Sequence, residues 1–250
     1  MNVLLIALLS FMTGDDDPVA LVPATSYRVE QARSEGGNRE LLVWSDGTRV
    51  HASLSQGENP LGYDSLIGMN GGSIFALNAA LKTWYELDSL TPLGLESRYL
   101  TPLKKEEARN VQWRMTAIEA PSTEVREYAG ELSYEVRGNM QGHRIKVNVS
   151  AVIRIITDGT QPRSAWLGRI LPLTSYDEVD ARLNESEATI EGLPQRMTLE
   201  VTRKFAGGEP MKDSMTIVVS DLARTEVTPS MFERPPAYRH QRPIIGAPGV

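Results

Sequence analysis

Short alternating segments separated by turn signals are the feature of this sequence that most restricts its fold. DGT at 46–48 and NGG at 70–72 each separate two runs in which apolar and polar residues alternate, and GGEP at 207–210 joins two longer runs. Asp-Gly or Asn-Gly between such runs is the strongest local signal for a β-hairpin. The sequence therefore predicts an antiparallel sheet built largely from segments that follow one another along the chain.

About ten strands with this two-residue period are expected. They include long strands at 111–119, 125–138 and 143–159 and a shorter one at 163–170. In the first of these, Val111, Trp113 and Met115 share one face, because successive side chains of a strand point to opposite sides.

Two segments interrupt this pattern and are expected to be helical. At 93–110 the alternation is lost, and Pro102 suits a first helical turn ahead of LKKEEAR. At 175–190, Ser175 can cap a helix that has Glu178 three residues later. The apolar positions of this second helix are Val179, Leu183 and Ala188. The predicted class is mainly β, with one or two short helices.

The N-terminal residues predict an exported protein. The apolar run Val3–Met12 has the length of a signal-peptide core and is too short to span a bilayer, although no Lys or Arg precedes it. A buried N-terminal helix is the alternative. The predicted organisation is a signal peptide and linker at 1–24, one β domain at 25–239 and a flexible tail at 240–250. No later segment is apolar enough to be a transmembrane helix.

Charge and cysteine content exclude several classes of function. The formal charge is −6, and the arginines are scattered singly, which argues against a nucleic-acid partner because such a partner requires a concentrated basic face. There is no cysteine, so disulfides, thiolate metal sites and cysteine nucleophiles are absent. Export to the periplasm or cell envelope is compatible with this composition.

No motif in the sequence supports catalysis or cofactor binding. His51, His143 and His240 are far apart and lack the spacing of metal ligands. No serine lies in GxSxG or SxxK. We therefore predict a protein that is not an enzyme and that has no catalytic residue, no metal and no cofactor, although a site assembled from distant residues stays open.

Polar residues on predicted strands and helices have an ordinary explanation. Glu185 and Glu187 are expected to be solvated on the second helix. NVS at 148–150 matches the glycosylation pattern, but an alternating strand explains it more simply by an Asn and a Ser that face solvent around a buried Val.

The aromatic residues in predicted strands allow two interpretations. One is packing of a sheet face against helices, and the other is the lining of an apolar cavity beneath a curved sheet. The candidate lining residues are Trp44, Trp84, Trp113, Met115 and Trp166.

The segment SMFERPPAYR at 230–239 predicts an extended, docked element, because Pro235 and Pro236 fix the backbone between two apolar anchors, Phe232 and Tyr238. Together with IFALNAALKTWYEL, RSAWLGRI and GLPQRMTLEVTRKF, this ending is similar to a bacterial family of exported domains of unknown function, whose members end in a phrase like FxxPxxY. That family is thought to share the fold of the LolA and LolB lipoprotein carriers. Pro236 departs from the family pattern, in which a more flexible residue is usual.

The resemblance implies an incomplete antiparallel barrel, a large curved sheet whose concave face is covered by helix around a hydrophobic cavity. It also implies work in the periplasm or cell envelope, where such a cavity would hold a lipid or acyl chain, and it carries over no catalytic residue. The alternative is a structural or protein-interaction module of the envelope that uses its strand edges or its C-terminal tail.

Overall fold

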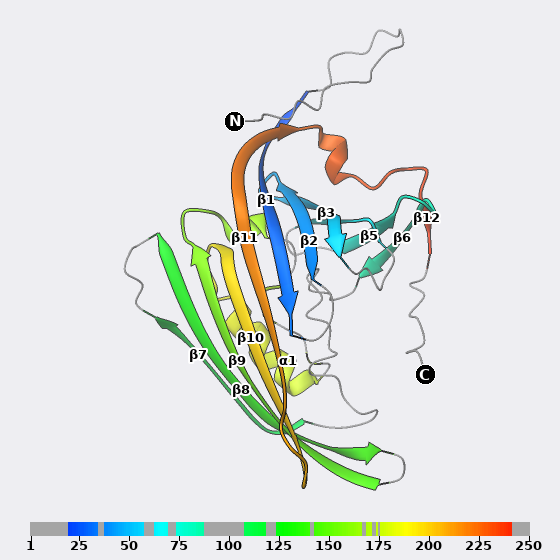
Figure 1. The fold of residues 1–250 in the computed structure, drawn as a ribbon. Coiled ribbons are helices and arrows are strands. Elements are labelled where there is room, and N and C mark those ends of the chain that lie inside the picture. The colour runs from blue at the N-terminus through cyan, green and yellow to red at the C-terminus, as the bar shows by residue number, and fades with distance from the viewer. Residues whose placement is uncertain are drawn as a thin grey trace.

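The strands of the protein form one large curved sheet that does not close into a barrel (Figure 1). The structure, a computed structural model, describes residues 20–34, 38–57, 63–69, 74–87, 108–118, 124–140, 143–166, 169–171, 174 and 176–241. The strands are β1 (Val22–Arg33), β2 (Arg39–Ser45), β3 (Arg49–Gly57), β4 (Ser65–Met69), β5 (Ile74–Asn78), β6 (Thr83–Leu87), β7 (Ala108–Ile118), β8 (Val125–Met140), β9 (His143–Asp158), β10 (Leu193–Phe205), β11 (Met211–Val227) and β12 (Arg239–His240). The described ranges also hold one α-helix, α1 (Asp177–Glu187), and two 3-10 turns, η2 (Arg163–Ala165) and η3 (Pro229–Phe232).

The sheet consists of two meanders joined by the pairing of β1 with β11. Its strand order is β12-β6-β5-β4-β3-β2-β1-β11-β10-β9-β8-β7. Every pair is antiparallel except β12 with β6, which is parallel. The predicted class, a mainly β incomplete barrel with a short helix, is confirmed.

The hairpin predicted at 46–48 is present, and its side chains explain why it forms. Asp46 Oδ1 accepts hydrogen bonds from the backbone N–H groups of Thr48 and Arg49, while Gly47 adopts φ 91°. Partial burial raises the pKa of Asp46, but the hydrogen bonds from Arg49 and Thr48 outweigh it and lower that pKa to about 2. The turn at 70–72 lies outside the described residues, although β4 and β5 on either side of it pair as predicted.

Two expectations about local structure meet a different outcome. The prediction of a strand at 163–170 is wrong. The 3-10 turn η2 begins after Pro162, and Trp166 then leaves the turn in extended conformation without pairing to the sheet. Most of the helical segment expected at 93–110 lies outside the described residues, and its last three residues begin strand β7.

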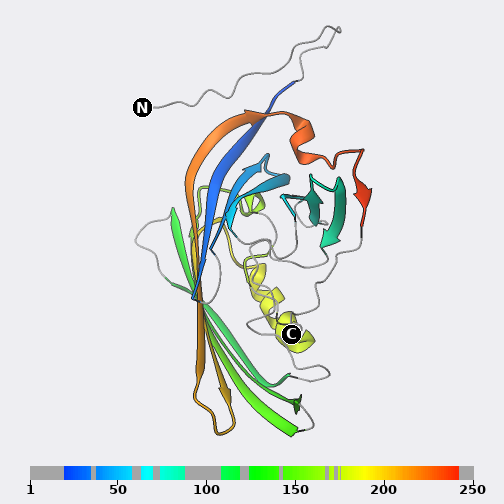
Figure 2. The ribbon, with the colours of Figure 1, turned by 45° about the vertical axis from the view of Figure 1, so that its right-hand side comes forward.

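The two faces of the sheet are used differently. We define the inner face as the one on which α1 lies, within the curve of the sheet (Figure 2). The main apolar cluster occupies this face, with residues such as Val29, Leu132, Ile155 and Leu199 alternating with outward-facing polar neighbours. The larger of these side chains contribute about 1.5–3 kcal/mol each on burial. The predicted alternation around Val149 is confirmed, since Val149 is buried and both of its neighbours are exposed.

The C-terminal segment 228–241 packs on the outer face, as its two anchors predicted. Phe232 is buried there in a second apolar cluster with Ala24 and Val227. Arg49 lies over the Phe232 ring at 4.9 Å. Tyr238 is half-buried, and the chain then forms β12 beside β6. Because η3 and a turn interrupt it, the segment is only partly extended.

His51 fastens this segment to the sheet. Its Nδ1 lies 2.6 Å from the carbonyl oxygen of Met231, and its ring meets the Trp44 ring edge-on at 5.8 Å. Burial lowers the pKa of His51, although the bond to Met231 acts in the opposite direction.

We expect the docking of the C-terminal segment to weaken in mild acid. Because the His51 pKa is lower in the folded protein, the unfolded chain binds the proton more readily once the pH falls below about 6.5. The melting temperature should therefore fall more steeply between about pH 7.5 and 5.5 in the native protein than in His51→Asn, which keeps an N–H donor but does not titrate. Near-UV circular dichroism measures the melting temperature at each pH. Equal slopes of melting temperature against pH in the two proteins would contradict this role of His51.

Candidate functional site

The inner face of the half-barrel, covered by α1 and η2, is the candidate functional site. Helix α1 presents Val179 and Leu183 to the sheet, and both are fully buried. Asp177, Glu178 and Asp180 lie in its first turn, where the helix dipole favours negative charge. Ser175, the predicted cap, lies outside the described residues. Asp180 instead accepts two hydrogen bonds from Thr174 and ties the helix start to the preceding chain.

Trp113 holds α1 against the edge strand β7. Its Nε1 donates a hydrogen bond to Ser186 Oγ at 2.7 Å. The indole lies across Gly130 of β8 so closely that a Cβ there would be 2.5 Å from its Cη2 atom. Only glycine at position 130 leaves room for this arrangement.

Glu187 fastens the other end of α1. Its two carboxylate oxygens accept hydrogen bonds from the backbone N–H groups of Ile170 and Leu171, and it also pairs with Arg163 at 2.6 Å. The side chain is only 14% exposed. The expectation that Glu187 is solvated is therefore wrong, whereas Glu185 is exposed as predicted.

Tyr27 connects the η2 segment to β1. Its hydroxyl donates to the carbonyl oxygen of Ala165 at 2.6 Å, and its ring stacks on Trp166 at 6.4 Å. Burial raises the Tyr27 pKa far above its usual value, and nearby Arg163 offsets this only in part. The hydroxyl therefore remains a donor at physiological pH.

Not all of the inner face is apolar. Gln31 Oε1, Tyr134 OH and Asp213 Oδ1 are buried and have no hydrogen-bond partner within the described ranges. Tyr134 packs edge-on against Tyr176 at 5.6 Å, and burial, together with Tyr176, raises its pKa. Asp213 pairs with Arg203 at 3.6 Å. Buried polar atoms of this kind call for water or a ligand group as a partner.

The structure separates the five predicted lining residues. Trp113, Met115 and Trp166 lie on the inner side, and Trp166 is buried. Trp44 and Trp84 lie on the outer face, so they cannot line the interior. Each is out of phase with an inner neighbour, Val43 and Tyr85 respectively. Trp44 belongs to the cluster around Phe232, and Trp84 lies beneath Arg234 at 4.0 Å.

Several partly exposed apolar side chains border the inner core. Leu54, Trp113, Met115, Ile145, Phe205 and Val219 pack against it without being fully covered. Sequence reasoning found Trp113 and Met115 through their two-residue period. It missed Phe205 and Ile145, although Ile145 lies between Arg144 and Lys146 in an alternating run.

Within the described ranges, no three His, Asp or Glu side chains come together as metal ligands would. None of the helices in this part of the chain has the length and apolar content needed to cross a bilayer. Comparison of the chain with protein-family models, with curated proteins and with solved structures finds no match. The resemblance to LolA and LolB thus stays a prediction that rests on the sequence phrases given above.

Replacing Glu187 by Gln should loosen the η2 segment. An amide cannot accept both backbone N–H groups and loses the charge opposite Arg163, so we expect a loss of about 1.5–3 kcal/mol in the free energy of unfolding. The control Glu185→Gln, on an exposed position of the same helix, should change it by less than about 0.5 kcal/mol. Urea titration followed by circular dichroism measures both, and equal effects would refute the contact.

Gly130→Ala should displace the Trp113 indole and weaken the contact between α1 and β7. Overpacking of this kind lowers the free energy of unfolding by about 1–3 kcal/mol. We expect faster amide exchange in α1 and a shift in tryptophan emission. Gly208→Ala is the matched control, because a Cβ there meets its nearest atom, the Phe205 Cβ, at an ordinary 3.6 Å. Unchanged exchange in α1 would show that the indole does not hold the helix.

Proposed function

We propose that this chain is a non-enzymatic protein of the cell envelope that holds an apolar ligand, a lipid or acyl chain, against the inner face of its half-barrel. The observation that carries the proposal is the incompletely covered apolar wall inside an open curved sheet. Curved sheets that do not fill their interior with their own side chains are common sites for small apolar ligands.

The wall offers both apolar surface and a few polar groups. Met115, Ile145 and Phe205 supply partly exposed apolar surface on three different strands. Tyr134 and Asp213 supply buried polar atoms that lack a partner in the described part of the chain. An amphiphilic lipid satisfies both requirements, since its tail would cover the apolar groups and its head would bond to the polar ones.

The cover is joined to this wall by hydrogen bonds as well as by the buried side chains Val179 and Leu183. Trp113 binds Ser186 and Tyr27 binds Ala165, whereas Glu187 joins α1 to the segment around Ile170 within the cover. Each of these contacts contributes on the order of 1 kcal/mol or somewhat more. Because Val179 and Leu183 are buried as well, we expect a ligand to bind where the wall is only partly covered and not to displace the whole cover.

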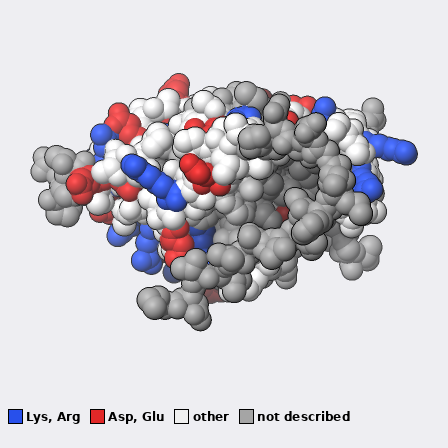
Figure 3. All heavy atoms as spheres, turned by 90° about the horizontal axis from the view of Figure 1, so that it is seen from above, with Lys and Arg blue, Asp and Glu red and all other residues white. Residues whose placement is uncertain are grey.

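The proposal includes no reaction and no nucleic-acid partner. No serine of the sequence lies in GxSxG or SxxK, and its three histidines lack the spacing of metal ligands. On the face seen in Figure 3, acidic and basic side chains are interspersed and do not form a single basic area. Location in the envelope rests on the apolar run Val3–Met12, which lies outside the described residues.

Binding of cis-parinaric acid, a fluorescent fatty acid, tests the proposal. The native protein should enhance the probe's fluorescence and transfer energy to it from tryptophan. Met115→Gln and Phe205→Gln should each weaken binding about threefold to tenfold, because they replace apolar contact surface on the inner face. Val152→Gln, a change on the exposed outer face, should leave binding unchanged. No enhancement by native protein, or equal binding by all variants, would refute the proposal.

A second candidate is a protein-interaction module of the envelope. Strand β7 favours it, because β7 is last in the sheet order and has a paired described strand on one side only. Such an edge can accept a strand from another chain. This candidate predicts a protein that does not bind the fatty acid and that forms a stable complex through β7.

A further inference from the structure

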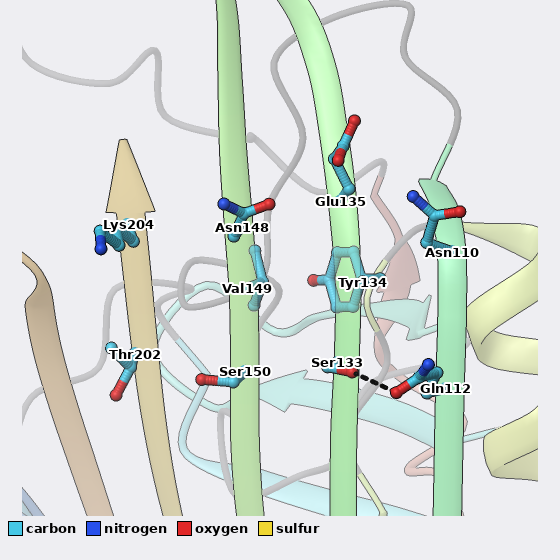
Figure 4. A pocket seen from close by; sticks show the side chains of 10 residues that line it. All are labelled: Asn110, Gln112, Ser133, Tyr134, Glu135, Asn148, Val149, Ser150, Thr202 and Lys204. Carbon is cyan, nitrogen blue, oxygen red and sulfur yellow. Dashed lines mark hydrogen bonds between the residues drawn. The ribbon is translucent and has the colours of Figure 1, made fainter. Parts of the chain in front are cut away.

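A polar hollow lies on the outer face of β7–β10, on the side of the sheet opposite α1. Its volume is about 410 Å³. Figure 4 shows that its side chains come from four neighbouring strands. We call it the outer groove, and it is lined by Asn110, Gln112, Ser133, Tyr134, Glu135, Asn148, Val149, Ser150, Thr202 and Lys204. Tyr134 and Val149 belong to the inner-face core, so the remaining eight lining residues are all of polar type.

One row of the outer groove consists of short, uncharged, hydrogen-bonding side chains. The strand register places Gln112 beside Ser133, Ser133 beside Ser150, and Ser150 beside Thr202. Adjacent members are about 4.8 Å apart, as neighbouring strands are. The next outward-facing row, two residues along each strand, contains Arg114 and Glu131 on β7 and β8. This uncharged row is therefore distinct from the charged row of Arg114 and Glu131 beside it.

A β-bulge turns Asn110 into the outer groove. The register between β7 and β8 shifts between Arg109 and Gln112, and Asn110 adopts φ 55°. Asparagine tolerates this left-handed conformation better than most residues do, and bulges commonly redirect a side chain next to a binding site. In Figure 4 the Asn110 amide lies above Gln112 at the same side of the hollow.

Glu135 provides a fixed carboxylate beside these amides. One of its oxygens pairs with Arg137 and the other with Lys146, each at 2.5 Å. Lys146 and then Arg137 hold the Glu135 pKa below its usual value. The carboxylate is thus ionised and positioned, and each oxygen retains a lone pair that can accept a further hydrogen bond.

We propose that the outer groove binds a glycan. Amides, hydroxyls and a positioned carboxylate offer donors and acceptors at short intervals, which is what the neighbouring hydroxyl groups of a sugar require. The lining has one carboxylate and one ammonium group, so it does not favour a polyanion such as a nucleic acid. An extended glycan has a repeat close to the spacing of strands, so successive sugars can meet successive strands across the sheet.

This site is independent of the apolar ligand proposed for the inner face. The two sites use opposite sides of the same strands, as Asn148 and Val149 show by pointing to opposite faces. A failure of one proposal therefore leaves the other standing, and side-chain signals that shift on ligand addition can be assigned to one face or the other, because alternate side chains of a strand point to opposite faces.

Titration with soluble oligosaccharides tests the glycan proposal. We would add triacetylchitotriose, maltotriose and isomaltotriose separately to the isotope-labelled chain and follow its backbone amide and side-chain signals. At least one sugar should shift signals from 110–112, 133–135, 148–150 and 202–204. The double variant Gln112→Ala, Asn148→Ala should weaken that binding about tenfold or more, as expected when two hydrogen-bonding partners are lost.

Thr116→Ala, an exposed outer-face change on β7 away from the outer groove, is the matched control and should bind as the native protein does. The proposal is overturned if none of the three sugars shifts these signals at millimolar concentration. It is also overturned if the double variant binds as tightly as the control. Shifts of inner-face side-chain signals alone, without shifts of the side-chain amides of Asn110, Gln112 and Asn148, would likewise reject the outer groove as the glycan site.

Discussion

A sheet that buries one face must be supplied with a cover for that face, and the structure depends on how this requirement is met. Twelve strands present far more apolar surface than α1, the one α-helix of the described ranges, can shield alone. Curvature of the sheet reduces the apolar area that other elements must cover, because it turns the inner side chains toward one another. The 3-10 turn η2 and α1 cover much of the remaining inner face. The apolar side chains left partly uncovered, such as Phe205 and Met115, are the consequence of this shortage and the basis of the proposed function.

The cover is attached by apolar burial and by polar contacts together, since Val179 and Leu183 of α1 are fully buried in the main apolar cluster. Trp113, Glu187 and Tyr27 each direct a hydrogen-bonding group to a backbone or hydroxyl partner in the covering segments. Such bonds fix position well but contribute modestly to stability. The outer face follows the same rule at one end, where the carbonyl of Met231 meets His51.

Local signals in the sequence predicted the sheet well. Asp46 forms its turn through contacts with residues two and three positions later, so the tripeptide alone contains the reason. The alternation of polar and apolar residues around Val149 likewise predicted that Val149 is buried between two exposed neighbours. The site was harder to predict. Alternation shows that Trp84 and Tyr85 face opposite ways, but both are apolar, and only residues about 150 positions later, such as Arg234, decide which face becomes the outer one. The role of Glu187 depends on backbone groups at 170 and 171, which no local pattern reveals.

The pairing of β1 with β11 also dictates the order in which the protein can be assembled. Val22 lies opposite Val227, and Arg28 bonds to Asp221 across 193 positions of sequence. During synthesis, the first six strands therefore leave the ribosome long before the strand that flanks them exists. Until then the edge of β1 that later pairs with β11 has no partner strand, and its apolar inner side chains are exposed. Such a strand can pair with a strand of another chain. We expect a holding chaperone to be most valuable to this protein in that interval, after β6 is made and before β11 emerges.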